Sequence, residues 1–473
     1  MKLTELTYEE KSILRFFEEI SAVPRVSGNT APIAAYLENF AKERGLRYYR
    51  DNSDNVIIYK VASKGYENRP TVILQGHSDM VGAIAPGISH DFSREGVRLI
   101  VDGDKLRADG TTLGGDDGVA LAYMLSVLDG GDEISHPSLE CVFTSDEETG
   151  LFGATSLDAN VLAGRRMINL DMGEEGIFIV GCAGGVRIDL TLPFAWERCE
   201  KETISVTLSG FAGGHSGEDI NKGRLNAIKE LAIMATELSG VQIAELTGGT
   251  ADNVIATEAN VKLICNENAE EVKKAFEKAL ESIKKIEKGA SFEIKSERCC
   301  EFLSEADSRT LLNLICALPF GVYAMSREIP DMVETSNNVG IVTANGEKCT
   351  LSLSVRSSVE EEKLALAEKI ESTAKNFGAN HLRHTDYPGW QYAKHSPLRD
   401  TMCKVFYELY GKDARVCTVH AGLECGIFSK KLDGLDCISI GPDNPYIHSV
   451  NEYVSISSFV RTYQYLKRVL KEI

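Results

Sequence analysis

Short apolar runs bounded by turn residues recur through the first part of the chain. They lie at 71–74, 139–144, 167–170 and 177–180. Runs of this length are typical of buried strands in a sheet. Apolar residues at helical spacing precede or separate them, at 8–20, 31–44 and 117–128. In the last of these, Val119, Tyr123 and Val127 are expected to form a stripe. The alternation predicts an α/β domain whose strands feed loops at the edge of the sheet.

The pattern changes at about residue 187. Strands with clearer polar and apolar alternation are predicted at 204–208, 261–265, 292–295 and 350–355, and amphipathic helices at 226–238, 270–286 and 360–376. We interpret 187–386 as an inserted α+β domain. From 387 onward the strand and helix alternation returns and ends in a helix with Phe459 and Tyr463 on one face. One α/β domain, formed by 1–186 and 387–473, is therefore expected to be interrupted by a second.

The chain is acidic, with 51 Lys and Arg against 70 Asp and Glu among its 473 residues. This balance argues against nucleic acid or an anionic membrane as a partner, because both attract a basic face. The N-terminus lacks the basic and apolar regions of a signal peptide, and no apolar run approaches about 20 residues. None of the 12 cysteines forms a Cys-x-x-Cys motif. We therefore expect a cytoplasmic protein with reduced thiols.

Residues with catalytic chemistry follow the predicted strands. His77 and Asp79 come directly after the run at 71–74 and point to the same side because strand side chains repeat every two residues. A carboxylate there could fix the imidazole tautomer that presents its other nitrogen to a metal. A His-x-Asp sequence is also common by chance, and a solvated turn is the alternative.

Two acidic segments lie in similar positions. Asp116 and Asp117 stand in a glycine-rich turn before a predicted helix, with no lysine that would make it a phosphate loop. Helix capping explains Asp117 well, but Asp116 less well because of the glycines around it. Asp146, Glu147 and Glu148 follow the strand at 139–144, and consecutive carboxylates require either full solvation or a cation.

Two further candidates are Asp171, at another strand end, and His448, in a late loop. Each candidate alone has a structural explanation. Together they supply imidazoles and carboxylates at several strand ends of one domain. Such a set suits a pair of divalent ions bridged by one carboxylate and a water or hydroxide. The mixed ligands favour zinc, with manganese or cobalt possible.

The motifs also carry a family resemblance over nearly the whole chain. They lie at 20–29, 76–81, 113–118, 146–150, 169–171, 181–185, 213–217, 421–426 and His448. The chain resembles the co-catalytic metallopeptidases that include the aminoacylases and carboxypeptidase G. The Gly-Cys-Ala-Gly-Gly and Ala-Gly-Leu-Glu-Cys-Gly stretches are similar to those of the aminoacyl-histidine dipeptidase (Xaa-His dipeptidase, carnosinase-like) branch. The resemblance implies a zinc-exopeptidase-like catalytic domain, with a central mixed sheet flanked by helices, and an inserted lid.

The resemblance also implies roles for the candidate residues. One metal ion would be held by His77, Asp116 and Asp171, and the other by Asp116, Glu148 and His448. Asp79 would orient His77. Glu147 would be the general base, taking a proton from the metal-bridging water and delivering it to the leaving amine. The family further has a cis peptide bond after the bridging aspartate, here between Asp116 and Asp117.

In the lid, the resemblance implies that His215, Asn253 and Arg356 bind the carbonyl oxygen and terminal carboxylate of the substrate. Arg356 could instead pair with a neighbouring acid, and His215 could cap backbone groups. After Asn253 the chain lacks the Pro-Arg that usually follows in this branch. Many members dimerise through the lid, so a homodimer is expected.

These observations predict a metal-dependent enzyme that hydrolyses unblocked dipeptides, of the Xaa-His or β-Ala-His type and also Cys-Gly. One alternative keeps the chemistry and changes the substrate to an aminotripeptide or an N-acyl amino acid. Another is a non-catalytic binding protein that retains a metal. The unligated carboxylate of Glu147 argues against the second alternative.

Overall fold

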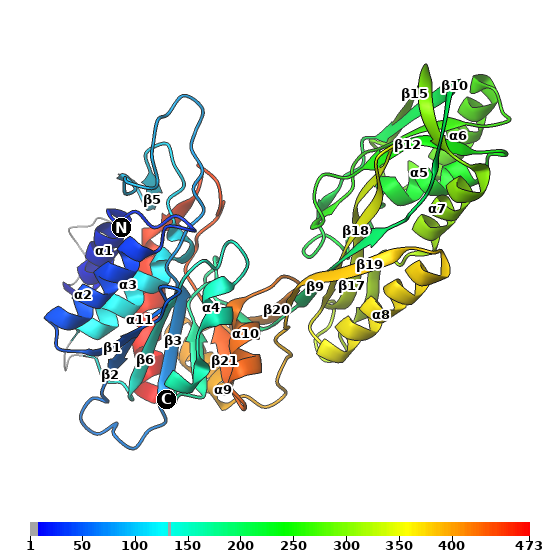
Figure 1. Cartoon of the computed structure of the whole chain (residues 1–473). Helices are drawn as coiled ribbons and strands as arrows, with labels where there is room; N and C mark the ends of the chain where they lie inside the picture. Colours follow the sequence, from blue (N-terminus) through cyan, green and yellow to red (C-terminus); the bar gives the residue numbers. More distant parts are fainter. Residues whose placement is uncertain (1–7, 131–133) are drawn as a thin grey trace. The chain divides into compact units, whose positions relative to one another are not determined.

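The computed structural model describes residues 8–130 and 134–473. The chain divides into two compact units (Figure 1). Unit 1 comprises the chain up to Gly181 together with 392–418 and 423–473, and unit 2 comprises 182–391 and a short return at 419–422. The domain limits expected from the sequence stay a prediction.

Unit 1 is built on an eight-stranded sheet. Its order is β1 (Arg47–Arg50), β2 (Val56–Lys60), β6 (Leu139–Thr144), β3 (Val72–His77), β7 (Arg166–Asn169), β21 (Asp436–Ser439), β8 (Ile177–Cys182) and β20 (Arg415–Val419). Strands β6, β3, β7 and β21 run parallel, whereas β1, β2 and β8 pair antiparallel to their neighbours. This mixed sheet, flanked by helices, confirms the predicted α/β class.

The helices of unit 1 are α1 (Tyr8–Ser21), α2 (Ala31–Glu43), α3 (Gly115–Asp129), α4 (Phe152–Ser156), α9 (Pro397–Tyr410), α10 (Glu424–Lys431) and α11 (Ile456–Glu472), with a 3-10 turn at Ala159–Val161. A small sheet of β22 (Tyr453–Ser455), β5 (Lys105–Ala108) and β4 (Leu99–Asp102) completes the unit.

Helix α3 differs from the amphipathic helix expected at 117–128. Every residue from Asp117 to Leu128 is buried, because β3, α1 and α11 all pack against this helix. The ring of Phe459 from α11 lies 4.8 Å from that of Tyr123 and 5.9 Å from that of Phe17. Aromatic pairs at these spacings add to the burial of the rings. This packing fixes the N-terminus of α3, and therefore Asp116, against the end of β3.

Unit 2 contains a nine-stranded antiparallel sheet. Its strands are β9 (Gly184–Thr191), β10 (Trp196–Ser209), β12 (Gln242–Gly248), β14 (Ala259–Ile264), β15 (Ser291–Leu303), β16 (Gly321–Met325), β17 (Val333–Ala344), β18 (Cys349–Ser357) and β19 (Asn380–Tyr387). Helices α5 (Ala227–Thr236), α6 (Ala269–Ile283), α7 (Glu305–Ala317) and α8 (Glu360–Asn376) cover it (Figure 1). Strands β11 (Gly214–His215) and β13 (Val254–Ile255) of this unit form a separate two-stranded antiparallel sheet.

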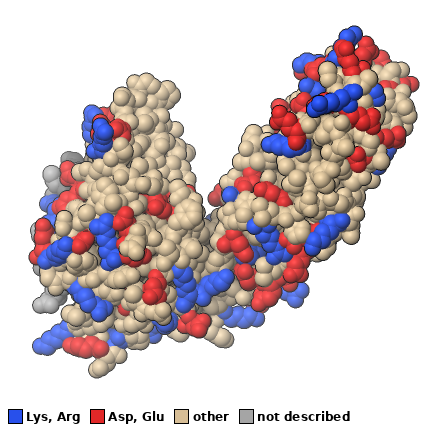
Figure 2. Space-filling model, viewed as in Figure 1, with Lys and Arg blue, Asp and Glu red and all other residues tan. Residues whose placement is uncertain are grey.

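Helix α6 shows how this unit assembles. Its buried residues Val272, Phe276, Leu280 and Ile283 recur at helical spacing and face the core, and a capping box at Asn268 fixes its start. Acidic and basic side chains are interspersed on both units in the view of Figure 2. Within 8–130 and 134–473, no helix has both the length and the apolarity that crossing a bilayer requires.

Candidate metal centre

The parallel strands of unit 1 bring several candidate side chains to one edge of the sheet. His77 is the last residue of β3 and pairs in register with Thr144, the last residue of β6. Glu147 and Glu148 follow β6, and Asp171 follows β7. Because parallel strands end at the same edge, a ligand crevice forms there.

Three groups of residues each bring their ligand atoms within 4.8 Å of one another. The groups are His77, Asp116 and Asp171; His77, Glu147 and Glu148; and Asp116, Glu148 and His448. Asp116 stands between the two imidazoles, with Oδ1 2.8 Å from Nε2 of His77 and Oδ2 3.1 Å from Nε2 of His448. Nε2 of His448 is also 3.0 Å from Oε1 of Glu148. The structure therefore brings together the residues predicted to hold two metal ions.

Asp79 lies behind this cluster and is fully buried. Its Oδ1 is 3.4 Å from Nδ1 of His77 and accepts the N–H of Glu147 at 3.0 Å. Its Oδ2 accepts the N–H of Glu148 at 3.3 Å. Nδ1 of His77 also lies 3.2 Å from the backbone carbonyl oxygen of Asp79. Asp79 therefore holds the backbone of both glutamates with its carboxylate and lies against the imidazole of His77 with its carbonyl and its carboxylate.

The loop before Asp116 is held by a second buried carboxylate. Glu452 accepts the N–H groups of Leu113, Gly114 and Asp116 at 2.8, 3.0 and 3.2 Å. The peptide bond between Asp116 and Asp117 is cis, as the resemblance implied. Asp117 accepts the N–H of Ala120 at 3.4 Å, so the capping explanation holds for this residue.

The electrostatics of the cluster depend on crowded, buried carboxylates. Burial and the neighbouring Asp116 raise the pKa of Asp171 well above its usual value. Burial also raises the pKa of Glu147, with a further contribution from Glu424. Hydrogen bonding to Asp116 raises the pKa of His448 to about 10. In each case the shift favours the protonated form, because that form lowers the negative charge crowded at the site.

Divalent cations fit this site on two grounds. Oε1 of Glu148 is buried and has no hydrogen-bond partner among residues 8–130 and 134–473, although it lies near His448. Three carboxylates and two imidazoles, arranged in two groups that share Asp116, form a donor set that suits zinc, manganese or cobalt. These residues could therefore hold a metal.

Unit 2 carries the three predicted substrate-binding residues. Arg356, on β18, donates from Nη1 to the hydroxyl of Tyr387 at 3.1 Å. Its buried Nε has no hydrogen-bond partner in the part of the chain that the structure describes. Burial and Arg356 lower the pKa of His215, on β11. The carbonyl of Asn253 accepts the N–H of Ser216 at 2.8 Å, which places its backbone beside the His215 turn.

The sequence interpretation missed His420. This residue belongs to the return at 419–422 and is 8% exposed. Its Nε2 lies 2.7 Å from Oγ of Ser336, and burial together with Arg356 and His215 lowers its pKa to about 3. The available signal was its place directly before the Ala-Gly-Leu-Glu-Cys-Gly motif.

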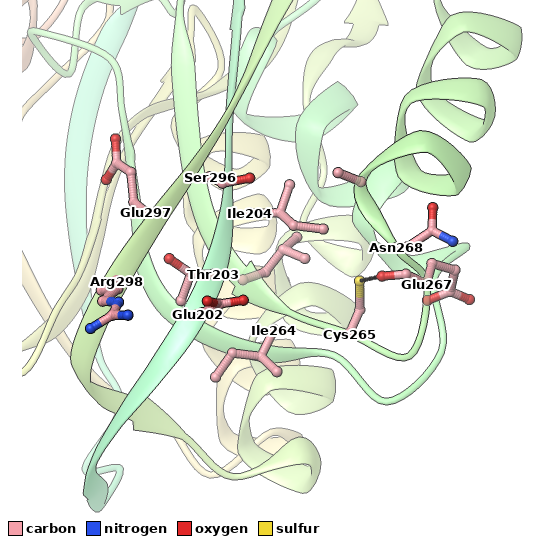
Figure 3. Close-up of a pocket in the computed structure, with 12 residues that line it drawn as sticks. Glu202, Thr203, Ile204, Ile264, Cys265, Glu267, Asn268, Ser296, Glu297 and Arg298 are labelled. Carbon is pink, nitrogen blue, oxygen red and sulfur yellow. Dashed lines mark hydrogen bonds between the residues drawn. The ribbon is translucent and has the colours of Figure 1, made fainter.

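A separate pocket of about 500 Å³ lies in unit 2, between β10, β14, β15 and the start of α6 (Figure 3). Cys265 and Glu267 line it, and the thiol donates to the backbone carbonyl of Glu267 at 3.3 Å. None of the predicted site residues contributes to its lining. The pocket is therefore distinct from the candidate metal ligands and from the predicted substrate-binding residues.

Parallel strands of unit 1 end in a cluster of imidazoles and carboxylates that could hold metal ions, as in a metal-dependent hydrolase. The chain belongs to the peptidase family M20/M25/M40, whose model matches residues 73–472, and is a hydrolytic enzyme. The family resemblance drawn from the motifs is thereby confirmed.

Three relatives show the extent of the similarity. The "Cytosol non-specific dipeptidase" of Escherichia coli is 34% identical over 469 residues, which cover 97% of this chain and 96% of the relative. The crystal structure of aminoacylhistidine dipeptidase from Vibrio alginolyticus has a TM-score of 0.90 at 32% identity and covers 100% of this chain and 98% of its own. That of aminopeptidase PepT from Bacillus cereus, with a TM-score of 0.58 and 16% identity over 98% of each chain, shows a similar fold.

Proposed function

We propose that this protein hydrolyses unblocked dipeptides with two divalent metal ions, preferentially zinc. The observation that carries the proposal is Asp116, which directs one carboxylate oxygen to His77 and the other to His448. A carboxylate in this position can bridge two ions. The names of the Escherichia coli and Vibrio alginolyticus relatives, both dipeptidases, support the proposal.

In this proposal His77, Asp116 and Asp171 hold one ion, and Asp116, Glu148 and His448 hold the other. Bound ions would polarise the peptide carbonyl and lower the pKa of a water molecule toward about 7. Zinc suits the mixed ligands best, and manganese and cobalt are the alternatives.

Glu147 acts as the general base. It lies beside His77 and Glu148, and its backbone is fixed by Asp79. A base must be within hydrogen-bond reach of the proton that it takes. Glu147 takes a proton from the attacking water and transfers it to the nitrogen of the leaving amino acid, so the amine departs neutral.

The residues of unit 2 bind the substrate. Nδ1 of His215 accepts the N–H of Glu218 at 3.3 Å, and the lowered pKa keeps this imidazole neutral. Its Nε2 then carries a hydrogen that can be donated to the scissile carbonyl oxygen. Arg356, with its free Nε, binds the terminal carboxylate, and Asn253 assists at the same end.

The preferred substrate has a C-terminal histidine, as in β-Ala-His, and Cys-Gly is a second substrate. We further propose a cytoplasmic location, which the word "cytosol" in the name of the Escherichia coli relative supports, and a homodimer formed through the lid.

A substrate panel with a Glu147→Gln variant tests the proposal. The zinc- or manganese-loaded enzyme is assayed on β-Ala-His, Gly-His, Cys-Gly, a tripeptide and acetylated amino acids. We expect dipeptide turnover, which Glu147→Gln lowers about 10²–10⁴-fold while keeping the metal content of the wild type. The matched variant Glu148→Gln should lose metal as well. Hydrolysis of only the acetylated amino acids would refute dipeptidase activity, and an active Glu147→Gln would refute the base.

A further inference from the structure

The segment Arg25–Gly28, between α1 and α2, contacts three loops that carry acidic candidates in unit 1, those with Asp79, Asp116 and Asp146. It belongs to a motif that the sequence singled out without assigning it a role. Arg25 is 2% exposed. Its Nη1 donates to the carbonyls of Ser78 and Asp79 at 3.2 and 3.0 Å, and its Nη2 donates to the carbonyl of Gly114. One guanidinium therefore joins the loop after His77 to the loop before Asp116.

The next residues extend these contacts. Ser27 donates from Oγ to Oδ2 of Asp79 at 2.7 Å, and its N–H donates to the carbonyl of Met80 at 3.2 Å. The N–H of Gly28 donates to Oδ1 of Asp146 at 2.6 Å. The segment thus reaches the carboxylate that orients His77 and the loop that carries Glu147.

The charge of Arg25 also matches its surroundings. Burial lowers the pKa of this guanidinium, whereas the carboxylates of Glu452 and Asp79, and of the two aspartates that follow Gly115, raise it. A buried cation is tolerated when it is hydrogen-bonded and paired with opposite charge. Arg25 meets the first condition at its two terminal nitrogens, which are bonded to carbonyls, whereas its buried Nε has no hydrogen-bond partner within 8–130 and 134–473. The carboxylates that raise its pKa supply opposite charge nearby without a direct ion pair among those residues.

We propose that Arg25 and Ser27 are positioning residues of the metal centre. They fix the relative positions of Asp79 and of the loop carrying Asp116 before metal binds, so metal affinity and turnover both depend on them. The geometry favours arginine because its planar fork reaches two loops at once, which the single ammonium of lysine cannot do. The inference rests on the proposed function only in assuming that Asp116 and His77 are metal ligands.

The test compares Arg25→Lys, Ser27→Ala and Ser27→Thr in the full chain. Zinc affinity is measured by competition with a chromophoric chelator, and kcat and KM are measured on a dipeptide. Loss of outer-shell partners lowers metal affinity about 10–100-fold. We expect a loss of this size for Arg25→Lys, a smaller loss of about 5-fold for Ser27→Ala, and recovery in Ser27→Thr, which keeps the hydroxyl. In both weakened variants kcat should fall and KM should stay near the wild-type value.

Arg399→Lys is the matched control. Arg399 is also buried, and its side chain donates to the backbone carbonyls of Ala393 and Lys394 at 2.7 and 2.8 Å. Its replacement should leave zinc affinity unchanged. Wild-type affinity and kcat in Arg25→Lys would overturn the proposal. If Arg25→Lys does not fold, Ser27→Ala decides: wild-type affinity in that variant overturns the proposal as well.

The outcomes separate this inference from the proposed function. A wild-type protein that binds zinc without hydrolysing any dipeptide refutes the function, while the affinities of the variants still test the segment. If the wild-type enzyme turns over dipeptides and Arg25→Lys has the same zinc affinity and kcat, only the role proposed for Arg25 and Ser27 is refuted. A wild-type protein that binds no divalent ion refutes both.

Discussion

Replacing Glu424 with glutamine should change how the stability of the metal-free protein depends on pH. Glu424 begins α10 and is 1% exposed. Its Oε2 accepts hydrogen bonds from Nε2 of Gln75 at 2.5 Å and from Oγ1 of Thr144 at 2.7 Å. Its Oε1 is buried and has no hydrogen-bond partner within the described residues. A glutamine carbonyl can take the place of Oε2 and keep both bonds, while the side chain can no longer ionise.

The expected magnitude follows from the pKa of Glu424. Burial raises it from 4.5 to about 7. A raised carboxyl pKa contributes stability that is fully present below the unfolded value and is lost as the pH rises through the folded value. At about 1.4 kcal/mol for each pKa unit, the loss approaches roughly 3 kcal/mol, of which about 2.5 falls between about pH 5 and about pH 8.

The assay is urea unfolding of wild type and Glu424→Gln in the presence of a chelator, at several pH values across this range. A constant offset between the proteins is acceptable, because the glutamine amide lacks a partner. The free energy of unfolding of the variant, relative to wild type, should rise by about 2–3 kcal/mol from about pH 5 to about pH 8. A difference that does not change with pH would refute the assignment of a raised pKa to Glu424.

Three further predictions concern other parts of the molecule. Asp79→Asn should weaken zinc binding about 10–100-fold in a chelator competition, because one amide oxygen replaces two carboxylate acceptors; unchanged affinity would contradict its orienting role. Arg356→Lys should raise KM about 10-fold or more with a smaller effect on kcat, since lysine cannot bind a carboxylate bidentately, and equal KM values would exclude the contact. Phe459→Ala should lower the free energy of unfolding of unit 1 by about 3–5 kcal/mol in urea denaturation, because the ring is fully buried. A loss below about 1 kcal/mol would contradict this prediction and show that neighbouring side chains fill the space left by the ring.

The sequence could predict the strands and the clustered candidates for one physical reason. Apolar runs such as 139–144 form parallel strands, and their carboxyl ends share one edge of the sheet. Residues at the end of a strand, such as His77, or shortly after it, such as Asp171, therefore converge even when they are distant in the chain. The complete burial of α3 could not be predicted in this way. Periodicity along α3 does not reveal that β3, α1 and α11 all pack against it.

The supporting residues could not be found in this way. Glu452 and the Asp116 backbone are 336 positions apart, and Arg25 and Gly114 are 89 apart. Such contacts form only when the folded chain brings distant loops together, and the pattern of residues in a single sequence does not show which loops these are. His420 is similar, because the short return at 419–422 reaches unit 2 without a change in composition.

Metal content tests the central claim most directly. The claim is that Asp116 bridges two divalent ions held by residues from separate strand ends. Elemental analysis of zinc-loaded, dialysed protein should give about two ions per chain for the wild type and fewer than one for Asp116→Asn, because the variant disrupts both sites. One ion or none in the wild type, or equal metal content in the variant, would contradict the claim.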